Sequence, residues 1–326
     1  MSHGARHPAF IYDAIRAGQP YHYRNKRPLV HNAINGACLL GLLAGLLLTA
    51  WLGTWVSPLV YVPLAAFAFG LLYFSIFILV VHEASHGMFL IAGNRRLHTW
   101  INRVPGWMVA TVFATHYGKH WEQGHLEHHV RPLETNDPQQ FNCEVGRTLA
   151  VGVARNVFIP GWLFLERTVF RTKRAGGKSS SSKGVIIAFV VIWALGLTLA
   201  TRWLGAPVAI AAFLGIHVLT AWNLVKGALE HGGSLRDEPD PFFRSRTTLF
   251  FGRRLLMPFN ITLHFEHHLN FCVPWYDLPR YQRDLRSIVP PSVTRDMINP
   301  DPWRQLAGRL GGLSRESAQL VSARTA

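Results

Sequence analysis

One stretch of the sequence decides the fold class. Residues 32–81 read NAINGACLLGLLAGLLLTAWLGTWVSPLVYVPLAAFAFGLLYFSIFILVV and contain no Asp, Glu, Lys or Arg. Because a helix crosses a bilayer with about 20 apolar residues, this run is long enough for two spans. Gly53 and Pro58 mark the break between them. We therefore predict two transmembrane helices, at about residues 32–53 and 57–81, joined by a tight turn.

A second pair of spans follows later in the chain. Residues 184–201 are apolar, and residues 203–225 again contain no Asp, Glu, Lys or Arg. Arg202 and a short turn separate the two segments, which predicts helices at about residues 184–201 and 206–228. The predicted fold is therefore an all-α integral membrane protein with four transmembrane helices in two hairpins.

The composition supports a membrane protein and excludes several other classes. Hydrophobic residues make up 49% of the 326 residues and charged residues 16%, whereas about 25% charged is usual in soluble domains. Three cysteines are too few for a disulfide scaffold, and no Cys-x-x-Cys pair is present to bind a metal. The first apolar run follows about thirty mostly polar residues and is too long for a signal peptide, so we expect none.

Topology accounts for the basic charge of the chain. The net charge is +15, from 33 Lys and Arg against 18 Asp and Glu. Only Arg202 lies at a predicted hairpin tip, and the other 32 of the 33 lie toward the opposite side. The positive-inside rule places that side in the cytoplasm. We expect one domain, residues 1–326, with cytoplasmic segments 1–31, 82–183 and 229–326 that include both termini and form a helical cap, and no nucleic-acid partner.

The segment between the two hairpins is not uniformly polar. Residues 104–114 are apolar but too short to span a bilayer, and residues 156–170 mix aromatic and charged side chains. Both patterns are typical of helices that lie against a membrane surface. Residues 173–183, KRAGGKSSSSK, predict a flexible linker.

The 17 histidines include three closely spaced groups. His82 and His86 form an H-x-x-x-H pair, and H-x-x-H-H occurs at residues 125–129 and again at residues 264–268. Residues three or four apart share a face of a helix, so each group directs two or three imidazoles the same way. His231 stands at the predicted cytoplasmic end of the fourth span. We expect the three groups and His231 to meet just beneath the membrane.

Nine imidazoles are too many for one metal ion and suit two. The expected ligands are His82, His86, His125, His128, His129, His231, His264, His267 and His268. Because imidazole binds zinc, copper, iron and nickel, the type of ligand does not identify the metal.

Acidic and amide residues near these histidines are expected to support them. Ligating imidazoles usually donate their outer N–H to a carboxylate, a carbonyl or water. We expect this role for Glu83, Glu127, Glu230 and Glu266, with ligation by one of them as the alternative. Asn223 and Asn260 are expected to hold a water near the metals or to bond between helices.

Four further histidines have more than one interpretation. We expect His98, His116 and His120 to be polar loop residues or hydrogen-bonding neighbours of the metals, with ligation as the alternative. His217 lies within the fourth span. An ionisable residue there is a functional candidate, and a hydrogen bond to a neighbouring helix is the alternative.

Two other protein classes fit part of the pattern. His82-Glu83-x-x-His86 is also the signature of zinc metalloproteases, in which Glu83 would be the general base. That interpretation leaves both H-x-x-H-H groups unexplained. A haem protein or a metal transporter also uses many histidines, but transport favours ligands inside the membrane rather than at helix ends.

Together the histidine groups resemble the three histidine boxes of the membrane fatty acid desaturase and hydroxylase superfamily. Residues 264–279, HFEHHLNFCVPWYDLP, are close to the family's third box and the Val-Pro, aromatic and Leu-Pro that follow it. The second box is similarly followed by Asp137-Pro138. The resemblance covers about residues 65–285, and the first box departs from the commoner pattern by having Glu83 in place of Asp.

The resemblance implies a non-haem centre of two iron ions, O2 as co-substrate and oxidation of an unactivated C–H bond in a lipid acyl chain. We interpret the reaction as fatty acid desaturation, with a hydroxylase or ketolase of a lipid, carotenoid or alkane as the alternative. The sequence contains no cytochrome b5, flavin, dinucleotide or iron–sulfur motif, so electrons are expected from a separate, ferredoxin-like donor. The expected location is a bacterial inner membrane.

Overall fold

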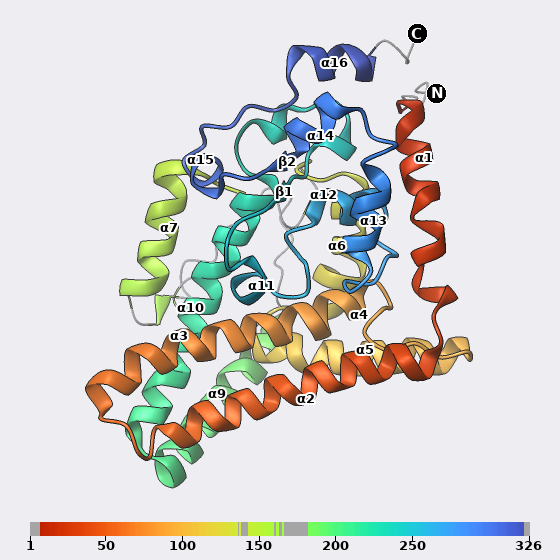
Figure 1. Cartoon of the computed structure of the whole chain (residues 1–326). Helices are drawn as coiled ribbons and strands as arrows, with labels where there is room; N and C mark the ends of the chain where they lie inside the picture. The colour runs from red at the N-terminus through yellow and green to blue at the C-terminus, as the bar shows by residue number, and fades with distance from the viewer. Residues whose placement is uncertain are drawn as a thin grey trace. The chain divides into compact units, whose positions relative to one another are not determined.

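The protein is described from a computed structural model, shown in Figure 1. The structure describes residues 7–135, 137, 143–159, 161–162, 165 and 182–322. Nearly all regular structure in these residues is helical. Two strands of two residues each, β1 (Thr247–Thr248) and β2 (Ile298–Asn299), pair in parallel.

Four helices are long and apolar enough to cross a membrane. They are α2 (Pro28–Leu52), α3 (Pro58–Ile76) with its continuation to Ser85, α9 (Lys183–Leu204) and α10 (Ala206–His231). The prediction of a mostly helical protein with four helices that could span a membrane is confirmed, and the pairing of these helices as two hairpins beneath which a cytoplasmic cap lies stays a prediction. Both α2 and α3 begin with a proline, whose missing N–H is not needed in the first turn of a helix. This explains why α2 begins at Pro28, directly after the last charged residue Arg27, rather than at residue 32, the predicted start of the span.

The chain divides into two compact units, each built from separated parts of the sequence. The span unit comprises Arg27–Glu127 and Ala150–Val225. The C-terminal unit comprises Met1–Lys26, His128–Leu149 and Lys226–Ala326. That the whole chain acts as one domain stays a prediction.

Small residues set the contact between α3 and α10 in the span unit. A Cβ added to Gly70 would lie 3.0 Å from the carbonyl oxygen of Gly215 and would also meet the side chain of Val218. A Cβ at Gly215 would lie 2.7 Å from that of Phe69. Small residues let the backbones of membrane helices approach closely, which increases their packing contact.

Replacing Gly70 should therefore disrupt this contact. Gly70→Leu is expected to destabilise the span unit by about 2 kcal/mol or more, because overpacking moves backbone as well as side chains. The matched control is Gly41→Leu on α2, since a Cβ there meets nothing within 4 Å. Thermal unfolding in detergent should show a lower midpoint for the first variant only, and equal midpoints would contradict the packing argument.

Two π-helical segments precede histidine groups. The first, η3 (Phe77–His82), leads into α4 (Glu83–Ser85), and the second, η4 (Tyr117–Gln123), leads into α6 (Gly124–Val130). A π-turn takes more residues than an α-turn, so it changes the direction in which the following side chains point. Such segments are frequent at functional sites, and here each ends within three residues of a predicted ligand.

The region between the second and third spans contains several helices among its described residues. Helix α5 (Arg95–Val112) contains most of the predicted segment 104–114 but begins earlier, where the side chain of Asn94 accepts a hydrogen bond from the N–H of Leu97. Its position at a membrane surface stays a prediction. Helix α7 (Gly146–Phe158) ends early in the predicted segment 156–170.

The rest of that prediction lies largely outside the described residues. The predicted linker, residues 173–183, also lies outside them except for Ser182 and Lys183. Ser182 caps α9, because its hydroxyl accepts a hydrogen bond from the N–H of Val185.

Short helices build the C-terminal unit. They are α1 (Ala9–Ala17), α11 (Arg253–Leu256), α12 (His264–Leu269), α13 (Leu278–Leu285), α14 (Pro291–Met297), α15 (Pro302–Leu306) and α16 (Arg315–Ser322), with 3-10 turns at Gln19–Tyr21, Tyr23–Asn25, Gly233–Asp237 and Pro241–Phe243. Their core includes the fully buried Ile11, Phe243, Leu263 and Val293. Helix α1 is bound to this core, since the hydroxyl of Tyr281 donates to its backbone.

A buried arginine joins separated segments of this unit. The guanidinium of Arg246 donates to the carbonyl of Asp296 at 3.1 Å, to Oε1 of Gln305 at 2.7 Å and to the carbonyl of Gly311 at 2.6 Å. Its backbone N–H donates to the carbonyl of Glu230 at 2.8 Å. Burial lowers the pKa of Arg246 to about 10. Arg246 therefore ties the C-terminal segment to the end of α10.

Candidate metal centre

Four histidines of the C-terminal unit form a buried cluster. His128 comes from α6, His231 from the last residue of α10, and His264 and His268 from one face of α12. The Nε2 atom of His231 lies 2.8 Å from that of His264 and 3.1 Å from that of His128. The Nε2 atoms of His264 and His268 are 3.1 Å apart. All four potential ligand atoms lie within 4.8 Å of one another, which suits a single metal ion.

The outer nitrogens of this cluster face acceptors. Nδ1 of His128 donates to Oδ2 of Asp137 at 2.8 Å, and Nδ1 of His231 donates to the carbonyl oxygen of Arg244 at 2.7 Å. Because a carboxylate and a carbonyl only accept, both Nδ1 atoms carry hydrogen. The inner Nε2 atoms then present lone pairs to the centre, as metal-binding imidazoles do. The donor set and its outer partners therefore fit a metal ion.

The protonation state of the cluster also suits a metal. Burial, and then the neighbouring imidazoles, lower the pKa of His264 and of His268 well below the usual value for histidine. Both rings are therefore neutral at physiological pH. Neutral imidazole is the form that binds metal ions.

A buried ion pair borders the same cluster. Nζ of Lys226 lies 2.5 Å from Oε2 of Glu230, one helical turn further along α10. The other carboxylate oxygen, Oε1, lies 3.5 Å from Nδ1 of His264. One turn of α10 thus provides the imidazole of His231 and a carboxylate next to a second imidazole.

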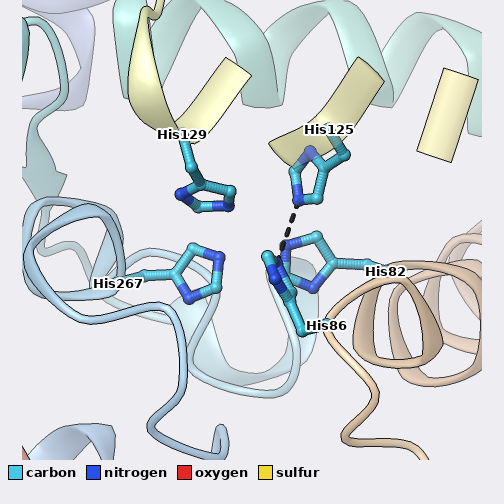
Figure 2. A group of neighbouring side chains, drawn as sticks. All are labelled: His82, His86, His125, His129 and His267. Carbon is cyan, nitrogen blue, oxygen red and sulfur yellow. Dashed lines mark hydrogen bonds between the residues drawn. The ribbon is translucent and has the colours of Figure 1, made fainter. Parts of the chain in front are cut away.

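The span unit contributes a second group, His82, His86 and His125. Figure 2 shows these three imidazoles turned toward one another, with the Nε2 atoms of His86 and His125 3.1 Å apart. The ring of His82 lies 4.9 Å from that of His86 and 4.8 Å from that of His125. Nδ1 of His82 lies 3.1 Å from Oε1 of Glu83, so its outer nitrogen also faces a carboxylate.

The remaining two predicted ligands, His129 and His267, lie together in the C-terminal unit. Their ring centroids are 4.6 Å apart and both side chains are buried. Figure 2 shows the two rings next to each other. Helix α6 belongs to both units, since the division between them falls after Glu127. It carries His125 at one end and His129 at the other.

The predicted supporting residues differ in what they contact. Glu83 and Glu230 face imidazoles as described above. Glu266 instead accepts hydrogen bonds from the hydroxyl of Thr247 and from Nε2 of Gln282, the latter at 2.7 Å. Glu127 is half-buried and makes no side-chain hydrogen bond to any described residue.

The two asparagines expected near the metals lie in different settings. Asn223 is half-buried on α10. Asn260 lies in a turn with a φ of 52°, before α12 begins, and its amide donates to the carbonyl of Trp275 at 3.0 Å. Their predicted roles beside the metals stay predictions.

Sequence reasoning missed two partners of the cluster, Asp137 and the carbonyl of Arg244. Asp137 follows His128 by nine positions, and its Oδ2 also accepts the N–H of Leu133 at 2.7 Å, which holds it in place. The Asp-Pro pair after the second box was the available signal. No sequence pattern indicates a backbone carbonyl such as that of Arg244.

The other histidines make local contacts in the span unit. Nδ1 of His98 accepts the N–H of Ala92 at 3.3 Å, and Nδ1 of His116 accepts the N–H of Lys119 at 3.2 Å. His120 is buried within η4, beside the ring of Trp121. Nε2 of His217 accepts the N–H of Gly161 at 3.2 Å.

Removing the carboxylate of Asp137 should weaken metal binding at the four-histidine cluster. Asp137→Ala is expected to lower affinity by about 10–100-fold, as is usual for an outer partner of a ligating imidazole. Titration with Fe²⁺ against a competing chelator would measure this. Glu127→Ala is the control on α6 and should bind as the parent protein does. Equal affinities of the two variants would show that Asp137 does not support the cluster.

The described residues thus combine apolar helices of membrane-spanning length with buried imidazole clusters that could hold metal ions. A family model described as "Fatty acid desaturase" matches residues 57–298, a range that includes all nine predicted ligands. The chain belongs to the fatty acid desaturase family, which confirms the resemblance of its histidine boxes. It is therefore a membrane oxidoreductase that oxidises lipids, of the desaturase or hydroxylase type. The comparison with curated proteins found no match.

Proposed function

We propose that the protein is an O2-dependent diiron enzyme that desaturates a lipid acyl chain. The observation that carries the proposal is the buried cluster of four imidazoles whose outer nitrogens face acceptors. In this proposal His128, His231, His264 and His268 bind one iron ion, and the other five predicted histidines bind the second. Imidazole is a suitable ligand for iron, and the desaturase family supports iron over other metals.

When bound, the two iron ions supply oxygen activation and the removal of hydrogen from an unactivated C–H bond. The protein's own residues orient the ligands, because Asp137, Glu83 and the carbonyl of Arg244 fix the rotation of the imidazoles that they contact. Burial of the cluster, in which His128 is 0% exposed and His264 1%, excludes water and the side reactions that water would permit.

Glu83 is better suited to orientation than to proteolysis. As a protease base it would act on a water bound to the metal. Here Oε1 of Glu83 lies against Nδ1 of its neighbour His82, where it can stabilise that imidazole. This contact supports the proposed lipid-oxidising enzyme over the zinc metalloprotease alternative.

In the proposed arrangement, the four spans form two hairpins in a bacterial inner membrane. Both termini and the metal-binding segments lie on its cytoplasmic side. The hydroxyl of Tyr61 on α3 donates to the carbonyl of Thr49 on α2 at 2.9 Å, which supports pairing of the first two spans. The orientation rests on the distribution of Lys and Arg.

A separate, ferredoxin-like protein is the proposed source of electrons, because the chain carries no redox motif besides its histidines. Arg95 and Arg96 are exposed at the start of α5. Such charges raise the association rate with an acidic partner and make it sensitive to salt.

Lipid analysis of a host that expresses the protein tests the proposed reaction. Desaturation removes two hydrogen atoms from an acyl chain, whereas hydroxylation adds one oxygen atom, so mass spectrometry separates the two. We expect new unsaturated acyl chains that are absent with the His231→Ala variant. Hydroxylated products would assign the chain to the hydroxylase branch. Unchanged lipids with iron-loaded protein and a competent electron donor would contradict the proposal.

A further inference from the structure

An apolar tip projects from the C-terminal unit at residues 250–256, FFGRRLL, which we call the tip loop. Phe251 is 103% exposed, and Leu255 is 72% exposed. Leu255 lies in the short helix α11 and Phe251 two residues before that helix begins, so two highly exposed apolar side chains stand within one short segment. Single exposed apolar residues are common, but a fully exposed phenylalanine beside a second large apolar side chain is costly in water.

The tip loop is held in a defined conformation. Gly252 has a φ of 78°, and its carbonyl accepts the N–H groups of Leu255 and Leu256, both at 3.0 Å. The carbonyl of Arg253 accepts the N–H of Met257 at 2.7 Å, and Met257 is buried at the base of the loop. A hydrogen-bonded turn therefore holds the apolar side chains of the tip loop in place.

The tip loop is also locally basic. Arg253 and Arg254 lie between the two exposed apolar residues, and no Asp or Glu occurs from residue 241 to residue 265. The guanidinium of Arg253 donates to the hydroxyl of Thr262 at 2.9 Å, which fixes it against the base of the loop. The side chain of Arg254 is exposed. This combination of apolar and basic side chains is that of segments that enter the headgroup region of a membrane.

We propose that the tip loop inserts into the lipid surface, with Phe251 and Leu255 at the boundary of the acyl chains and Arg254 against a lipid phosphate. Two exposed apolar side chains offer far less area than the roughly 800 Å² per partner of a stable protein interface. A bilayer accepts such a tip, and the membrane helices of the same chain keep lipid at a high effective concentration. The basic side chains complement anionic headgroups.

Spin labelling in nanodiscs of mixed neutral and anionic phospholipids tests this inference. The label is attached at Phe251→Cys and, as the matched control, at Gln319→Cys on the exposed face of α16, with the labelled parent protein as the blank for the natural cysteines. Collisions with O2, which concentrates in lipid, are compared with collisions with a water-soluble nickel chelate. We expect the label at position 251 to collide several-fold less with nickel, and more with O2, than the label at position 319.

A charge variant and the addition of protein partners distinguish contact of the tip loop with lipid from contact with protein. Arg254→Glu should reduce the exclusion of nickel at position 251 in anionic nanodiscs, because it removes the contact with phosphate and adds repulsion. Nickel access equal to that at position 319 would overturn the proposal. Exclusion that occurs only after an electron-donor protein is added, or only with two chains in one disc, would assign the tip loop to a protein contact and would also overturn it. None of these readouts depends on bound iron, so they are independent of the proposed reaction.

Discussion

His231→Ala is expected to remove iron from one site and to abolish turnover. Nε2 of His231 is the closest inner neighbour of His264 and also lies 3.1 Å from Nε2 of His128, so it links ligands from α6 and α12. Losing a ligand should weaken metal binding by more than the roughly 10–100-fold expected for an outer partner. Iron content after gel filtration and product formation with a chemical reductant would both be measured.

The control for this substitution is His98→Ala in the span unit. His98 makes a local contact with the backbone of Ala92, so its loss should leave most of the iron in place. If the two variants retain equal amounts of iron, His231 is not a ligand.

Arg246→Met is expected to destabilise the C-terminal unit strongly. The substitution leaves the acceptors of Asp296, Gln305 and Gly311 without their donor, and the unmade hydrogen bond to the buried Gln305 is the most costly of the three. We expect a loss of about 3 kcal/mol or more, which is in the range of disrupted buried networks. Thermal unfolding followed by circular dichroism in detergent would measure it.

Two further variants make the test of Arg246 specific. Arg246→Lys should not restore stability, because an ammonium group cannot reproduce the forked geometry of a guanidinium. Arg295→Met removes an exposed ion pair with Glu316 and should change stability by less than about 1 kcal/mol. A parent-like unfolding midpoint for Arg246→Met would contradict the role given to this residue.

The four helices that could span a membrane could be predicted because length and apolarity are local properties of the sequence. The groups of histidines could be predicted for a similar reason, since spacings of three and four residues place side chains on one helical face. The π-helical segments that end at His82 and just before His125 could not be predicted, because their widened turns depend on packing against other helices.

Nearness in the sequence does not predict which carboxylate contacts a ligating imidazole. Glu266 lies two residues after His264, which is about 200° around a helix, so it points away from the face that carries His264 and His268. It bonds to Thr247 and Gln282 instead. Asp137 is nine residues from His128 and reaches it through a loop. Helical phase and loop geometry, rather than distance along the chain, decide which carboxylate supports an imidazole.

Elemental analysis with ⁵⁷Fe Mössbauer spectroscopy on anaerobically purified protein tests the two-iron assignment most directly. We predict about two iron ions per chain, the number that nine imidazoles can hold. The Asp137→Ala variant should alter the signal of one iron ion and leave the other unchanged. Stoichiometric zinc with activity retained, or full activity with a single iron ion per chain, would contradict the assignment.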